Sequence, residues 1–171
     1  MINIQFKILL LIMVISLILV AGCNNSQDNT NQKMPDDFNF SLTYGTYGKQ
    51  KIDTLNNVVV KDLVEDGTIE ASISLTKKEK QAIYDEMMKI DIMSELNLDE
   101  ENKEKECQHE PSSISKWDIL MNGETKSFYY KAYCEYPEDV LNLIKLEEYI
   151  HKVVSSKKEY MDLPEGKGSY Q

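Results

Sequence analysis

The chain has 171 residues, and its 29 acidic side chains outnumber 19 lysine and arginine side chains, which gives a formal net charge of −10. All 19 of these basic residues are lysines. The chain therefore lacks the basic surface that attracts nucleic acid and the planar guanidinium groups that usually clamp phosphates, so we expect no nucleic-acid partner.

Residues 1–22 have the organisation of a targeting segment. Lys7 supplies a positive charge, and residues 8–20 are apolar except for Ser16. As a helix this run would be roughly 20 Å long, whereas the hydrocarbon core of a bilayer is about 30 Å thick. The segment is short for a transmembrane helix and typical of a signal peptide. An uncleaved membrane anchor is the alternative.

Small residues and a cysteine end this segment. Leu19 precedes Val20-Ala21-Gly22-Cys23, which resembles the lipobox of bacterial lipoproteins. The resemblance implies a signal peptide over residues 1–22, cleavage before Cys23, and attachment of a diacylglycerol (the lipid whose chains include palmitate) to the Cys23 thiol. Two acyl chains hold a protein stably on a membrane, whereas one does so only reversibly. The alternative is a chance cysteine after an ordinary signal peptide.

Residues 23–37 connect this cysteine to the first apolar strand. Residues 24–37 are mostly Asn, Gln, Ser, Thr and Asp, and such a segment cannot form a core. As a flexible polar tether they would span about 20 Å root-mean-square. We therefore expect a single folded domain over residues 38–162, followed by an irregular C-terminal tail over 163–171, where glycine and proline recur.

The first half of the domain predicts three strands. Alternating apolar residues indicate a half-buried strand over 38–44, and Gly45 and Gly48 mark a loop. Asp66-Gly67 predicts a tight hairpin between residues 58–64 and 68–75. That turn pairs Val64 with Ile69, Val60 with Ile73 and Val58 with Leu75 on one buried face, while Lys61, Glu70, Ser72 and Ser74 face outward.

The second half predicts a helix, a hairpin and another helix. Thr76 and Glu79 form a capping-box pattern at the start of a helix whose apolar stripe includes Ile83, Met87 and Ile90. Asn122-Gly123 predicts a hairpin in which Trp117 faces Phe128, Ile119 faces Lys126 and Ser115 faces Tyr130. Pro137 predicts the start of a longer helix.

This order predicts an α+β fold: an antiparallel sheet of about five strands with two helices packed on one face, in the order β-β-β-α-β-β-α. Residues 99–106 are strongly charged and predict a solvated loop or a frayed helix.

Cysteines and histidines are the first candidates for chemistry. Cys107 and Cys134 are a possible disulfide, because thiols outside the cell tend to oxidise. With His109 and Glu110 they could also form a zinc ligand set, but their spacing matches no common zinc pattern. Free thiols are the third alternative. We expect no metal and no cofactor.

Other side chains give weaker signals. His151 lies in the predicted last helix, where a boundary position explains it better than catalysis. Tyr129 and Tyr133, with Lys131 between them, share the outward side of their strand and could contact a sugar or a protein; packing under a neighbouring element is the alternative. The sequence contains no nucleophile elbow, phosphate loop or His-Glu-x-x-His motif, so we predict no catalytic residue.

The stretch "LTYGTYGKQKIDTLNNVVVKDLVEDGT", the helix "LTKKEKQAIYDEM" and the end "SSKKEYMDLPEGKGSY" resemble uncharacterised lipoproteins of Gram-positive bacteria. This resemblance implies a domain type and a location on the extracytoplasmic face of the cell membrane, and assigns no catalytic residue. We expect a lipid-anchored, non-catalytic binding or interaction module with a protein or cell-wall partner. A cell-envelope hydrolase that uses Asp or Glu carboxylates, and a purely structural envelope role, are the alternatives.

Overall fold

The computed structural model describes residues 33–99 and 110–170. They form one antiparallel sheet of six strands in the order β4-β3-β2-β1-β5-β6. The strands are β1 Asn39–Tyr44, β2 Gln50–Asp53, β3 Val58–Asp62, β4 Thr68–Ser72, β5 Ile114–Met121 and β6 Glu124–Lys131. The helices are α2 Lys77–Lys89, α3 Glu138–Ser155 and the short α4 Lys158–Met161. The predicted α+β class is confirmed.

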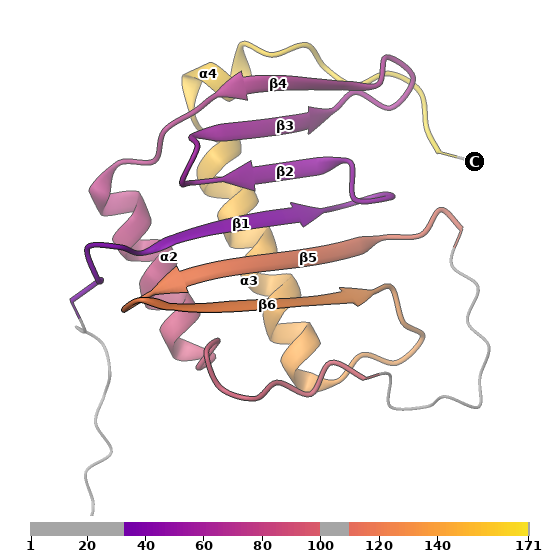
Figure 1. The fold of residues 1–171 in the computed structure, drawn as a ribbon. Helices are drawn as coiled ribbons and strands as arrows, with labels where there is room; N and C mark the ends of the chain where they lie inside the picture. Colours follow the sequence, from indigo (N-terminus) through magenta and orange to yellow (C-terminus); the bar gives the residue numbers. More distant parts are fainter. Residues whose placement is uncertain (1–32, 100–109, 171) are drawn as a thin grey trace, which may run out of the picture.

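Helices α2 and α3 both lie behind the sheet in Figure 1, so the described helices cover one face and leave the other open. Most of the large apolar residues of the sheet point towards these helices and form the core. Its fully buried side chains include Phe38, Leu42, Trp117, Ile83, Met87, Leu143 and Ile150. Burying such side chains supplies the main favourable free energy of folding, at roughly 1.5–3 kcal/mol for each large one.

Local sequence signals place several elements where they were expected. The Thr76 hydroxyl accepts a hydrogen bond from the Glu79 amide, and the Glu79 carboxylate accepts one from the Thr76 amide, which completes the capping box. In the hairpin at Asn122-Gly123, Trp117 faces Phe128 as predicted, with the two rings stacked at 6.1 Å between centroids. The residue after Pro137 begins α3.

The register predicted for the first hairpin is wrong. Val60 lies opposite Glu70 rather than Ile73, a shift of three residues, and an odd shift exchanges the two faces of a strand. Consequently Val59 and Lys61 point into the protein, while Val58 and Val60 face away from the helices.

The C-terminal tail pairs with the loop of this hairpin. The Lys167 amide donates to the Leu63 carbonyl, and the Lys167 carbonyl accepts from the Glu65 amide. These bonds form a parallel bridge between Val64 and Lys167. Together with the bond from the Leu63 amide to the Gly67 carbonyl, they hold residues 63–67 as a wide loop instead of a two-residue turn. The tail therefore pairs with the loop, although it forms no helix and no strand over the described residues 163–170.

Strand β2 was not predicted. Only one of its four residues, Ile52, has an aliphatic side chain, so its sequence carries little strand signal. It forms because β1 pairs with it across the turn that begins at Gly45, where the Gly48 amide donates to the Gly45 carbonyl at 3.0 Å. This strand inserts Asp53 into the open face of the sheet.

Candidate functional site

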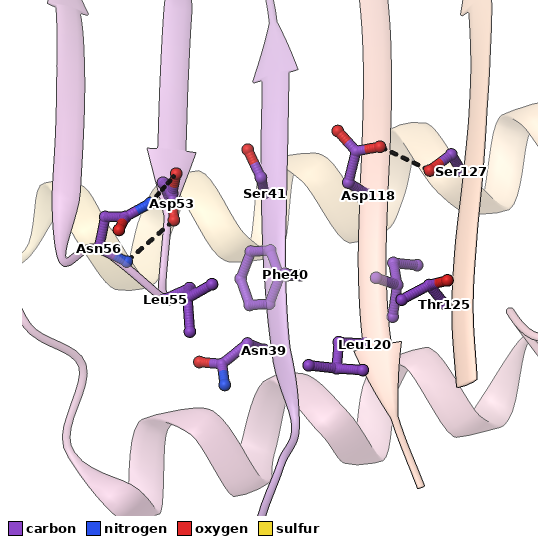
Figure 2. Close-up of a pocket in the computed structure, with 11 residues that line it drawn as sticks. Asn39, Phe40, Ser41, Asp53, Leu55, Asn56, Asp118, Leu120, Thr125 and Ser127 are labelled. Atoms are coloured by element: carbon purple, nitrogen blue, oxygen red, sulfur yellow. Dashed lines mark hydrogen bonds between the residues drawn. The ribbon is translucent and has the colours of Figure 1, made fainter. Parts of the chain in front are cut away.

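The open face of the sheet carries a shallow hollow of about 430 Å³ near the start of β1 and the end of β5. Seven of its eleven lining residues have short polar side chains, while apolar atoms, among them those of Leu55 and Leu120, make up most of its exposed surface (Figure 2). The lining residues are Asn39, Phe40, Ser41, Asp53, Leu55, Asn56, Asp118, Ile119, Leu120, Thr125 and Ser127.

Four of these residues form a row across the sheet. Ser41 of β1 lies opposite Asp53 of β2 on one side and opposite Asp118 of β5 on the other. Asp118 in turn lies opposite Ser127 of β6. Figure 2 shows the four side chains at one level across neighbouring strands. Because adjacent strands are about 4.8 Å apart, the row presents carboxylate and hydroxyl groups alternately at that spacing.

Asp53 is held tightly at one end of the row. Its carboxylate accepts hydrogen bonds from the backbone amide and the side-chain amide of Asn56, both at 3.0 Å, and forms an ion pair with Lys51 at 3.1 Å. Burial by itself would raise the pKa of Asp53, but these donors outweigh burial and hold the pKa below its usual value. Asp53 therefore stays anionic at neutral pH.

Asp118 is more accessible. One carboxylate oxygen accepts a hydrogen bond from the Ser127 hydroxyl at 2.6 Å, and the other lies 3.8 Å from Nζ of Lys116. About half of the Asp118 side chain is exposed, so this long ion pair contributes little to stability and leaves the carboxylate available to a ligand.

Of the remaining polar groups of the hollow, some are hydrogen-bonded within the protein and others are available to a ligand. Oδ1 of Asn39 accepts from Nζ of Lys80 at 2.9 Å, which ties the hollow to α2. The Ser41 and Thr125 hydroxyls have no hydrogen bond to another described residue. The hollow thus combines a fixed frame with groups that can still form hydrogen bonds. That arrangement suits binding, whereas acid catalysis would need a carboxyl group with a raised pKa.

A second polar group lies on the opposite, helix-covered side of the sheet. The Tyr44 hydroxyl lies 2.8 Å from Nδ1 of His151 on α3, and the Tyr130 hydroxyl donates to Glu147 on the same helix. Burial lowers the pKa of His151 and raises that of Glu147. Tyr44, Gln50, Ile144, Glu147, Glu148 and His151 line a small cavity there of about 210 Å³.

The structure places the sequence candidates apart from one another. Tyr129 is 64% exposed on the open face, beside the row that contains Ser127. Tyr133 packs against the core, and its hydroxyl donates to the Leu98 carbonyl. Of the predicted surface that includes Tyr129 and Tyr133, only Tyr129 and Lys131 are therefore exposed. His151 is half-buried at the boundary position that was predicted.

The cysteines lie partly outside the described residues. Cys134 is disulfide-bonded. Cys107, His109 and Cys23 belong to the undescribed segments, so pairing of Cys134 with Cys107 and lipidation of Cys23 stay predictions. The Glu110 carboxylate accepts a hydrogen bond from the Tyr47 hydroxyl. Within residues 33–99 and 110–170, no three His, Cys, Asp or Glu side chains are grouped closely enough to hold a metal ion.

Sequence reasoning missed the hollow because its residues look like ordinary outward-facing strand positions. Asp53 lies on the strand that was not predicted. In the sequence, Asp118 and Ser127 look like any solvent-facing residues of a strand. Only the register brings them into one row.

Comparison with known proteins adds no assignment. The described part of the chain contains no helix of the length and apolarity that a membrane span needs. No protein-family model and no curated protein matches the sequence.

Proposed function

We propose that this protein is a lipoprotein of the extracytoplasmic membrane face whose folded domain is a non-catalytic binding module, and that the hollow on the open sheet face is its binding surface. The observation that carries the proposal is the uncovered face itself. The helices cover one side of the six-stranded sheet, while the other side presents the polar row of Asp53, Ser41, Asp118 and Ser127. Membrane attachment rests on the lipobox that ends at Cys23.

The carboxylates of the hollow favour binding over hydrolysis. A carboxylate-based hydrolase needs one carboxylic acid with a raised pKa to protonate the leaving group. The pKa of Asp53 is instead held low by Asn56 and Lys51. Among residues 33–99 and 110–170, the carboxyl group whose pKa is raised is that of Glu147, which lies on the helix-covered side of the sheet and does not line the hollow.

Binding is tested with the full-length, detergent-solubilised protein on a support, incubated with solubilised cell-envelope material. Ser41→Arg fills the centre of the hollow, and Thr125→Arg does so from the edge strand β6. Ser72→Arg is the matched control, since Ser72 faces the same side on β4 but does not line the hollow. We expect wild type and Ser72→Arg to retain a component that both hollow variants lose. Equal retention by all four proteins, or none by any, would overturn the proposal.

Anchoring is tested separately with Cys23→Ser. We expect the wild-type protein in the membrane fraction, with an intact mass that corresponds to a chain starting at a lipidated Cys23. The variant should be released from the membrane or keep its leader. A wild-type mass without lipid would refute the anchor and leave the binding surface untouched.

A further inference from the structure

Resting on this proposed function, we infer that the ligand of the hollow is a neutral, hydroxyl-rich glycan chain, bound across the strands by the polar row and stacked on Tyr129. The inference concerns what the surface recognises, and it follows from the charge balance, the free hydrogen-bonding groups and the exposed ring.

Charges around the hollow are balanced within the protein. Each aspartate of the row has a lysine two residues away on its own strand: Lys51 lies 3.1 Å from Asp53, and Lys116 lies 3.8 Å from Asp118. Both lysines flank Thr43 in the neighbouring row of the open face. A surface of paired opposite charges gives no strong attraction to a polyanion or to a basic peptide, so a ligand of low net charge is favoured.

The available groups match a polyhydroxylated ligand. The Ser41 and Thr125 hydroxyls form no hydrogen bond to another described residue, and each can both donate and accept. Oδ2 of Asp118, the oxygen that is not bonded to Ser127, has only the long contact with Lys116 and can accept a hydrogen bond from a ligand hydroxyl. A sugar ring offers donors and acceptors around its edge, at distances comparable with the spacing of about 4.8 Å between strands.

Apolar surface borders these polar groups. Leu55 at the tip of the β2–β3 loop is 66% exposed, and Leu120 lies on the same side of the hollow (Figure 2). Tyr129 stands on the open face of β6, two residues along from Ser127, and is 64% exposed. The C–H faces of sugar rings pack on such side chains, while their edges form hydrogen bonds. Tyr129 lies opposite Lys116 in the neighbouring row, so a chain that leaves the row at Ser127 and turns along β6 would reach its ring.

The test uses two probes made from the same envelope material: polysaccharide freed of protein by protease and of lipid by solvent extraction, and protein freed of polysaccharide by glycosidases. We expect the wild-type full-length protein to retain the polysaccharide and not the protein. Raising the salt concentration should leave retention unchanged, since a neutral ligand is not screened. Tyr129→Ala should lower the affinity about tenfold, as loss of an aromatic contact does in a binding hot spot. Leu141→Ala, at an exposed apolar position on α3, is the control.

The outcomes separate the two levels of inference. If only the protein probe is retained, and Ser41→Arg abolishes that retention, the proposal of a glycan ligand is wrong and the hollow remains the binding surface. If retention of the polysaccharide falls steeply as the salt concentration rises, the proposal that the ligand is neutral is wrong. Polysaccharide retention that survives both Ser41→Arg and Thr125→Arg would overturn the hollow as its site, and with it the proposed function.

Discussion

The hydroxyl oxygen of Tyr44 lies 2.8 Å from Nδ1 of His151, and this contact joins the central strand β1 to α3 through the core. The imidazole also packs edge-on against the ring of Tyr160 on α4, at 6.0 Å between centroids. A titratable group thus holds the last two helices against the sheet, and the stability of the domain should depend on its protonation.

His151 predicts a loss of stability in mild acid. Burial, with the nearby charge of Lys61, holds its pKa below the ordinary value of about 6.5. The unfolded chain therefore binds the proton more readily, and the stability contributed by neutral His151 is present above pH ~6.5 and is lost as the pH falls towards the folded pKa. His151→Gln should be less stable than wild type at about pH 8, and the difference should shrink towards pH 5. Urea unfolding across this range measures it; a constant difference would contradict the mechanism.

Glu147 predicts the opposite trend. Burial raises its pKa, with a smaller contribution from Glu148, so the folded state holds the proton more tightly than the unfolded one. Wild type therefore loses stability as the pH rises from the unfolded value of about 4.3 through the folded pKa. Glu147→Gln keeps an acceptor for Tyr130 and cannot ionise, so its stability relative to wild type should rise over the same window. Glu70→Gln, at an exposed position on β4, is the control and should show no such trend.

The capping box predicts a defined cost at the start of α2. Thr76→Ala removes the acceptor of the Glu79 amide and should lower the free energy of unfolding by about 1 kcal/mol. Thr76→Ser keeps the hydroxyl and should retain most of the stability. Chemical denaturation of the three proteins provides the comparison, and an alanine variant as stable as wild type would show that water replaces the cap.

The hydrogen bonds of Lys126 connect β6 to the residues after α2, and we expect them to stabilise the domain. Its ammonium donates to the carbonyls of Ile92 and Ser94, which follow the helix, and burial lowers its pKa. Lys126→Met removes both bonds and should cost about 1.5–3 kcal/mol, the range for hydrogen bonds to charged groups. Lys131→Met alters an exposed lysine on the same strand and should change stability little. Equal stability of the two variants would show that the hydrogen bonds from Lys126 to the Ile92 and Ser94 carbonyls do not stabilise the domain.

The sequence by itself determined the elements whose signals are local. The cap at Thr76, the Asn122-Gly123 hairpin with its Trp117–Phe128 pair, and the helix after Pro137 depend on residues within a few positions of one another. Propensity and turn chemistry therefore sufficed to place them, together with the antiparallel sheet and the covered face.

Only the tertiary structure decided the rest. The loop between β3 and β4 pairs with Lys167, about one hundred residues away in the chain, and the register of this hairpin turns Lys61 inward and Val60 outward. Strand β2 exists because β1 pairs with it, and the row of Asp53, Ser41 and Asp118 exists because three strands align. Ser41 and Asp118 are polar residues at outward-facing strand positions, and nothing in the sequence around them shows which residues of other strands stand beside them. The hollow becomes visible when long-range pairing fixes which polar side chains stand side by side.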